Sequence, residues 1–334
     1  MNPTTKPHTT TETPRSPGVA GRGARHRQHI PRRTTRLVAV VLAAAIASAA
    51  CGSTETPIAA RAATGTPATA APDASVASPA AVRPTGEVDR LVAIPGGRMH
   101  LRCTGHGDAT VVLISGWDGG DGTWEGIEPA LAARSRVCSS ARFGTGTSDP
   151  ATEPRTFTDA SRDLRVLLDM AGEPGPYVLL GHSFGGAVAV TFAATDPSGV
   201  KALLLLDASP TDWPSVVCTV PAYREACDLM HDPARDAERL DVFPAFDEVA
   251  RISSLGDVPL TVMTGAHRDA TGLSPAEVER LEATWAAGQE RWAGLSSTSR
   301  IVTVEQTGHH IEVDQPARVV EELEALLGAR RSDA

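Results

Sequence analysis

The chain has 334 residues, of which 41% are hydrophobic and 21% charged, and its formal net charge is −9. This length could hold two domains, but the first 86 residues do not have the pattern of a folded unit, so we expect one sizeable domain. The first 50 residues contain eight of the 31 basic residues and one of the 40 acidic ones, which leaves a net charge of −16 on the remainder. This acidic balance excludes a general affinity for nucleic acid.

Residues 1–50 have the pattern of a signal segment. A polar, basic stretch precedes the apolar run 37–50, which is too short for a comfortable membrane span and fits the apolar part of a secretory signal. The small residues at its end, followed by Cys51, resemble the lipobox of bacterial lipoproteins, in which the cysteine is lipidated and begins the mature protein. Because Ser48 stands where that motif usually has an aliphatic residue, simple cleavage is the alternative. We expect an exported protein that is held at the outer face of the cell membrane by a lipid anchor, or is secreted.

Residues 51–86 consist mostly of Ala, Thr, Pro and Ser. A segment of this composition cannot bury a core, and we expect it to be a disordered tether. It would hold the folded domain, residues 87–334, away from a membrane surface.

Strand and helix signals alternate from residue 91 onward. A hairpin is predicted where the apolar segments 91–94 and 99–103 flank Pro-Gly-Gly. Further strands are predicted at 110–115, 136–141, 177–180, 200–208, 259–265 and 300–306, and helices at 124–133, 159–171, 186–194 and 316–328. Apolar strands that alternate with helices indicate an α/β fold, with a mainly parallel sheet covered by helices on both faces.

The segment 209–257 interrupts this alternation. It is too long for a simple connection and is rich in Pro, Asp and aromatic residues. An insertion here would lie over the carboxyl ends of the strands, where ligands bind in open α/β sheets, so we interpret it as a cap. Trp213 and Phe243 within it suggest an apolar ligand, although residues of this kind are more often core. Trp285 and Trp292, on a predicted helix after the cap, are expected to pack one helix face rather than to contact substrate.

The segment around Ser183 has the clearest catalytic pattern. A short apolar strand runs into Gly181-His182-Ser183-Phe184-Gly185, and an alanine-rich helix follows. A serine on so sharp a strand-to-helix turn is held in a strained conformation, and crowding requires that positions 181 and 185 lack a Cβ. This arrangement is a nucleophile elbow, which lifts the hydroxyl clear of the sheet.

Four motifs, in the order LISGWDGG, ARFGTGTSD, GHSFGG and TGHHIEVDQP, make residues 91–328 resemble the α/β-hydrolase superfamily. The resemblance implies that Ser183 is the nucleophile and that His309 is the general base, with His310 as a packing or pocket residue. It also implies that the backbone N–H groups of Trp117 and Phe184 form the oxyanion hole.

The resemblance leaves the catalytic acid open between two aspartates. The family usually places the acid after the strand that precedes the histidine strand, and this position favours Asp269. Asp207 ends the strand before that one, where some lipases carry their acid. Either carboxylate could orient the imidazole and stabilise the imidazolium, and either could instead cap a turn.

Four cysteines remain after Cys51, an even number that favours two disulfides in an exported protein. In the resembled fold the second strand lies beside the fourth, which would pair Cys103 with Cys138. Cys218 and Cys227 lie close together within the cap and would form the other bridge. Four free thiols are the alternative, and no closely spaced Cys/His cluster indicates a metal.

A serine at the elbow, rather than an aspartate, argues against the epoxide hydrolase and dehalogenase branches of the superfamily. The expected reaction is acyl transfer to water through an acyl-enzyme. We therefore predict a serine hydrolase of the esterase or lipase type, without cofactor or metal, that acts on a small-molecule ester with an apolar acyl or alkyl group. The alternatives are a non-catalytic surface binding protein that retains the hydrolase fold, and a peptidase of the same fold.

Overall fold

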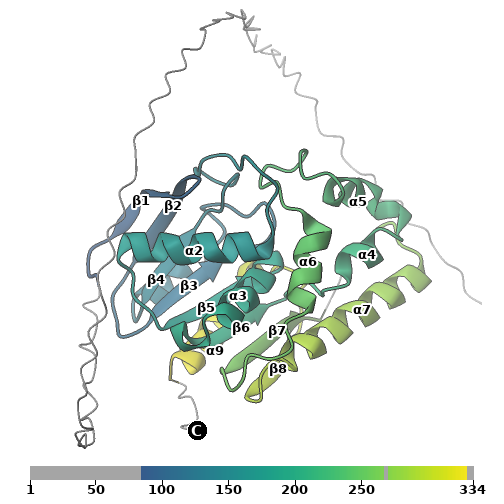
Figure 1. Cartoon of the computed structure of the whole chain (residues 1–334). Helices are drawn as coiled ribbons and strands as arrows, with labels where there is room; N and C mark the ends of the chain where they lie inside the picture. Colours follow the sequence, from purple (N-terminus) through teal and green to yellow (C-terminus); the bar gives the residue numbers. More distant parts are fainter. Residues whose placement is uncertain (1–83, 267–269, 329–334) are drawn as a thin grey trace, which may run out of the picture. The chain divides into compact units, whose positions relative to one another are not determined.

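The computed structural model describes residues 84–266 and 270–328, and these contain a single eight-stranded sheet in the order β1-β2-β4-β3-β5-β6-β7-β8 (Figure 1). The strands are β1 Val88–Ile94, β2 Gly97–Thr104, β3 Thr110–Ile114, β4 Arg136–Ser140, β5 Tyr177–His182, β6 Val200–Leu206, β7 Leu260–Gly265 and β8 Ser299–Val304. Every neighbouring pair from β4 to β8 is parallel, whereas β2 is antiparallel to both of its neighbours. The predicted mainly parallel α/β sheet is confirmed.

The central strands are buried on both faces because helices cover both sides of the sheet. In β3, the side chains of Val112 and Ile114 belong to one hydrophobic cluster, and those of Val111 and Leu113 belong to the other. Successive side chains of a strand point to opposite faces, so a strand between two helical layers must be apolar at every position. The same rule explains why the run 200–206 is almost entirely aliphatic.

The helices are α1 Glu128–Ala132, α2 Phe157–Ala171, α3 Phe184–Thr195, α4 Trp213–Val217, α5 Arg224–Met230, α6 Val242–Ala250, α7 Pro275–Ala293, α8 Ile311–Asp314 and α9 Pro316–Gly328, with short 3₁₀ turns at Pro197–Gly199 and Pro221–Tyr223. In Figure 1, α2, α3 and α6 cross the near face of the sheet. The buried side chains of α3 belong to one cluster and those of α9 to the other, so these two helices cover opposite faces.

The helix predicted at 124–133 is shorter than expected. Turns occupy residues 121–127, and α1 begins at Glu128 with Pro129 in its first turn. Proline has no backbone N–H and fits the first turn of a helix better than its interior, so it favours a helix start at this point. The prediction was therefore wrong for residues 124–127.

The insertion 209–257 contains α4, α5 and α6 and no named strand. It contacts the main domain at Arg155, in the loop before α2. The N–H of Arg155 donates to Arg239 O (2.9 Å), and its carbonyl accepts from the N–H of Asp241 (2.8 Å). These backbone bonds fix the stretch between α5 and α6 against the domain.

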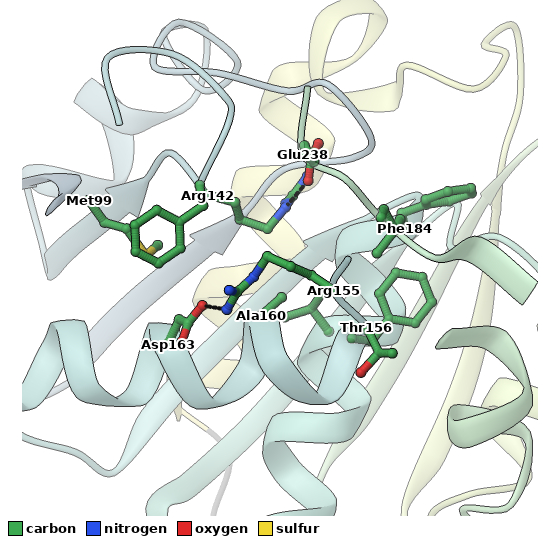
Figure 2. A pocket seen from close by; sticks show the side chains of 12 residues that line it. Met99, Arg142, Arg155, Thr156, Ala160, Asp163, Phe184 and Glu238 are labelled. Atoms are coloured by element: carbon green, nitrogen blue, oxygen red, sulfur yellow. Dashed lines mark hydrogen bonds and ion pairs between the residues drawn. The ribbon is translucent and has the colours of Figure 1, made fainter. Parts of the chain in front are cut away.

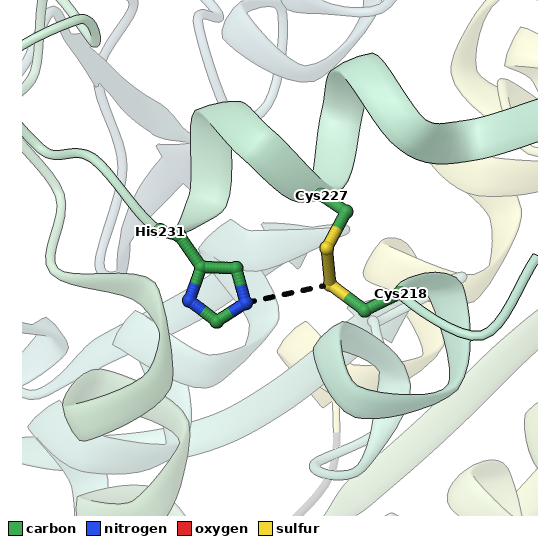
Figure 3. Close-up of side chains that lie close together, drawn as sticks. All are labelled: Cys218, Cys227 and His231. Atoms are coloured by element: carbon green, nitrogen blue, oxygen red, sulfur yellow. Dashed lines mark hydrogen bonds between the residues drawn. A yellow bond between two sulfur atoms is a disulfide. The ribbon is translucent and has the colours of Figure 1, made fainter. Parts of the chain in front are cut away.

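The structure contains both predicted disulfides. Cys103 and Cys138 are register partners on β2 and β4, with Cα atoms 4.1 Å apart and both residues fully buried. Cys218 and Cys227 join the end of α4 to α5, with Cα atoms 5.0 Å apart, and His231 Nε2 lies 3.9 Å from Cys218 Sγ (Figure 3). The second bridge therefore links two short helices of the cap.

Several predictions fall on residues that the structure does not describe. The signal segment, Cys51, the tether up to residue 83, and Asp269 all lie outside the described residues. Within 84–266 and 270–328, no helix is both long and apolar enough to cross a bilayer.

Candidate active site

Ser183 connects β5 to α3 in a conformation that few L-residues adopt. Its φ is 53° and its ψ is −123°, and its N–H donates to the carbonyl of Leu206 on the neighbouring strand (3.1 Å). A Cβ on Gly181 would lie 2.4 Å from the carbonyl oxygen of Gly185, and one on Gly185 would lie 2.2 Å from that of Ile114. Both glycines are therefore needed for the turn to close, as the sequence predicted.

The structure brings Ser183 together with His309 and Asp207. His309 lies on the loop between β8 and α8, and its Nε2 is 3.0 Å from Ser183 Oγ. Its Nδ1 is 2.7 Å from Oδ2 of Asp207, the residue directly after β6. One imidazole thus contacts a hydroxyl through one nitrogen and a carboxylate through the other, which is the geometry of a Ser-His-Asp triad.

Asp207 is fully buried, and its second oxygen is also bonded. Oδ1 accepts hydrogen bonds from Thr264 Oγ1 (2.9 Å), from the N–H of Gly265 (3.2 Å) and from Nε1 of Trp285 (3.0 Å). These donors fix the carboxylate opposite His309. Asp269, the aspartate that the sequence favoured, lies outside the described residues.

Trp285 differs from its expected role. Besides its bond to Asp207, its ring lies edge-on to His309 with ring centroids 5.5 Å apart, and it lines the cavity at Ser183. The spacing of Trp285 and Trp292 along the helix predicted that both pack against the core. That prediction describes Trp292, which is fully buried. No local pattern separated the two tryptophans, because the acceptor of the Trp285 indole N–H, Asp207, lies 78 residues away along the chain.

His182, directly before the nucleophile, supports the histidine loop. Its Nε2–H donates to the backbone carbonyl of His309 (3.0 Å), and the two rings lie 4.7 Å apart. Burial, together with the neighbouring His309, lowers the pKa of His182 to about 4. The ring is therefore neutral near pH 7 and acts as a hydrogen-bond donor. His310 points elsewhere, with Nδ1 3.0 Å from Glu312 Oε1.

The two residues predicted to supply the oxyanion hole are near Ser183: Phe184 follows it in the chain, and the loop that carries Trp117 packs against it. Phe184 begins α3, and the first N–H groups of a helix have no intrahelical acceptor. Trp117 follows Gly116, where a Cβ would lie only 3.0 Å from Ser183 Cβ, so this loop lies directly against the nucleophile. The rings of Trp117 and Phe184 are stacked, with centroids 5.2 Å apart.

A buried ion pair that no sequence pattern predicted is hydrogen-bonded to the backbone of this loop. Arg142 Nε donates to Glu238 Oε2 (2.7 Å) and Nη2 donates to Oε1 (2.9 Å), as Figure 2 shows. Burial lowers the pKa of Arg142, but hydrogen-bonded Glu238, together with the nearby carboxylates of Asp236 and Asp118, outweighs it and leaves the pKa above its usual value. Arg142 belongs to the ARFGTGTSD motif, but its partner is 96 residues away in the cap, where no local pattern signals it.

A mostly apolar cavity opens at Ser183 and His309 and has a volume of about 660 Å³. Its walls come largely from the cap and α7, and they include Trp213, Val217, Tyr223, Met230, Leu281 and Trp285. Phe243, the other aromatic residue singled out in the cap, instead stacks on His231 with ring centroids 4.3 Å apart. The cavity can hold an apolar group next to the Ser183 hydroxyl.

Three groups of described side chains have the spacing of metal ligands. Two of them contain the disulfide cysteines, which do not offer thiolates. The third combines His182, His310 and Glu312, but the Nε2 of His182 already donates to a carbonyl and the Nδ1 of His310 already bonds Glu312.

Comparison with known proteins points to one fold. A family model described as alpha/beta hydrolase fold matches residues 109–225. A lipase from Mycobacterium tuberculosis is 43% identical over 88 residues, which are 26% of this chain and 31% of the lipase. A pimeloyl-acyl-carrier-protein methyl ester esterase from Nitrosomonas europaea is 30% identical over 121 residues, 35% of this chain and 45% of that protein. The chain spans less than half the length of these curated relatives.

Solved structures resemble nearly the whole described domain. A carboxylesterase from Bacillus subtilis superposes with a TM-score of 0.53 and 18% sequence identity, covering 73% of this chain and 93% of the carboxylesterase. At this identity the likeness concerns the fold, and the chemistry has to be argued from the residues of this chain.

The close packing of the elbow leads to a stability prediction. Gly185→Ala places a Cβ against the carbonyl oxygens of Ile114 and Ser115, at 2.2 and 2.5 Å, and should lower the free energy of unfolding by about 1–3 kcal/mol. Gly294→Ala is the control, because Gly294 has φ −61° and a Cβ there meets nothing closer than 3.4 Å. Urea unfolding of both variants measures the difference, and equal stability would contradict the packing described here.

Proposed function

We propose that this chain, an α/β-hydrolase by its fold, is a serine hydrolase that cleaves carboxylic esters through an acyl-enzyme intermediate. The observation that carries the proposal is the position of His309, with Nε2 at 3.0 Å from Ser183 Oγ and Nδ1 at 2.7 Å from Asp207 Oδ2. A serine hydroxyl is a weak nucleophile, and a hydrogen-bonded base held in one tautomer is the usual means of activating it.

The reaction would proceed in two similar halves. Ser183 Oγ attacks the ester carbonyl as His309 removes its proton, and buried Asp207 stabilises the imidazolium that forms. The N–H groups of Trp117 and Phe184 donate to the carbonyl oxygen as it becomes negative. His309 then protonates the departing alcohol. In the second half, His309 activates a water molecule that attacks the acyl-enzyme and releases the acid and the Ser183 hydroxyl.

The cavity supports an apolar acyl or alkyl group as the part of the substrate that is bound. Cap side chains such as Trp213, Val217 and Met230 line it directly beside Ser183. A volume of about 660 Å³ lies within the range typical of small-molecule sites. The names of the relatives, lipase and methyl ester esterase, support an ester rather than a peptide as the substrate class.

The first prediction concerns the nucleophile. Ser183→Ala should lower the rate of hydrolysis of a short-chain aryl ester by on the order of 10⁵, since it removes the hydroxyl that His309 Nε2 contacts. It should also abolish labelling by a fluorophosphonate probe. Ser198→Ala, an exposed serine just beyond α3, is the control and should behave as wild type. More than a tenth of the wild-type rate in Ser183→Ala would refute the proposal.

The second prediction concerns the acid, which we propose is Asp207. Asp207→Asn keeps the side-chain shape but favours the wrong imidazole tautomer, and it should lower the ester rate by about 10⁴. Asp269→Asn should leave the rate within a few fold of wild type. Rates are compared at equal folded fraction, determined by circular dichroism. Collapse of activity in Asp269→Asn, with Asp207→Asn nearly unchanged, would identify Asp269 as the acid.

The third prediction concerns export, and it rests on the sequence of residues 1–86. We propose that the mature protein begins at a lipidated Cys51 and is tethered to the outer face of the cell membrane. Intact-mass analysis should find an acylated Cys51 at the amino terminus, and Cys51→Ser should move the protein out of the membrane fraction or leave it unprocessed. A mature protein that begins elsewhere and carries no acyl group would contradict lipidation and leave simple secretion.

A further inference from the structure

We propose that Glu238 of the cap and Arg142 of the loop after β4 are positioning residues that together aim the Trp117 N–H at the oxyanion. The inference rests on the proposed function, because it assumes that Trp117 is one of the two oxyanion donors. It goes beyond that function in making the oxyanion hole depend on a carboxylate supplied by the cap.

Arg142 binds two carbonyl oxygens of residues 115–118, the loop that carries Trp117 and is called the oxyanion loop below. Its Nη1 donates to the carbonyl oxygen of Ser115 (2.7 Å) and its Nη2 to that of Gly116 (2.6 Å). The carbonyl of Gly116 and the N–H of Trp117 belong to the same peptide group, which is planar and trans, so they point in opposite directions. A guanidinium that fixes the Gly116 oxygen on one side therefore fixes the direction of the Trp117 N–H on the other.

Glu238 holds the next peptide of the same loop. Its Oε1 accepts a hydrogen bond from the N–H of Asp118 (2.6 Å) while both of its oxygens also contact Arg142. Asp118 has a φ of 58°, a conformation that a residue with a Cβ seldom keeps without support. The peptide groups on both sides of Trp117 are thus tied to one ion pair.

The backbone that carries Glu238 is itself fixed to two loops of the main domain, one after β4 and one before α2. It crosses Gly144 so closely that a Cβ there would lie 1.9 Å from the carbonyl oxygen of Ala237. On the other side, Arg239 O and the N–H of Asp241 bond the backbone of Arg155. The Glu238 carboxylate can therefore reach the loop only when this part of the cap lies against the domain.

The burial of the pair favours a positional role over a purely stabilising one. The side chains of Arg142 and Glu238 are 12% and 5% exposed. Removing two charges from water costs about as much as their attraction returns, so a buried pair adds little stability relative to apolar residues of the same size. A planar guanidinium instead offers donors in fixed directions, and here they reach both the carboxylate and two loop carbonyls.

The experiment compares transition-state binding with substrate binding. Glu238→Gln and Arg142→Lys should lower kcat for an aryl ester by about 10- to 100-fold with KM nearly unchanged, because a misaimed donor weakens binding of the oxyanion but not of the acyl group. The affinity for an arylboronic acid, which forms a tetrahedral anion on serine, should fall by the same factor. Glu238→Asp should recover part of the loss.

Two further variants separate positioning from folding. Glu248→Gln removes another cap carboxylate, one that accepts from Thr158 Oγ1 (2.7 Å) and has no bond to the oxyanion loop, and it should keep wild-type kcat and boronate affinity. The double variant Arg142→Met with Glu238→Met leaves no unpaired charge, so it should fold yet remain slow.

Wild-type turnover and boronate affinity in that folded double variant, or in Glu238→Gln, would overturn the inference while leaving the proposed function intact. A wild-type protein that neither hydrolyses the ester nor reacts with a fluorophosphonate would overturn the proposed function, and this inference with it.

Discussion

The strand-to-helix turn at Ser183 forces three stretches of backbone into contact. The turn closes only because Gly181 and Gly185 lack side chains, and the loop at Gly116 approaches so closely that a Cβ there would touch Ser183. A residue held at φ 53° costs on the order of 1–3 kcal/mol, which the surrounding packing must supply. The almost fully buried strands on either side of β5 provide that packing, since they fix where β5 ends and where α3 can begin.

The same sheet sets the position of the other two members of the proposed triad. Ser183, Asp207 and His309 each follow a parallel strand, namely β5, β6 and β8. The carboxyl ends of parallel strands lie along one edge, so residues up to 126 positions apart meet without any local sequence relation. The cap supplies the apolar wall above this edge, and its disulfide between Cys218 and Cys227 joins two of the helices that form the wall.

Polar groups at the site are held in fixed directions by buried partners. Asp207 accepts hydrogen bonds from Trp285 and from Gly265 at the end of β7. His182 donates to the backbone carbonyl of His309. Arg142 and Glu238 are hydrogen-bonded to the backbone of the oxyanion loop. Each of these groups is costly to bury unless it is hydrogen-bonded. In the proposed mechanism these contacts would set donors and acceptors in place before a substrate arrives, and such preorganisation is a large part of enzymatic rate enhancement.

The sequence by itself determined the mainly parallel α/β sheet, because strands between two helical layers are apolar along nearly their whole length. It also determined the turn at Ser183, because only a tight turn requires glycine at both 181 and 185. The family resemblance indicated His309 and implied the pair Cys103–Cys138, and closeness along the chain suggested the pair Cys218–Cys227. Only the tertiary structure brought Asp207 to His309, Trp285 to Asp207 and Glu238 to Arg142. Each of these contacts joins residues on different elements, 78 to 102 positions apart. Local patterns report the conformation and burial of neighbouring residues, whereas a contact of this kind depends on where separate strand ends and the cap come to lie.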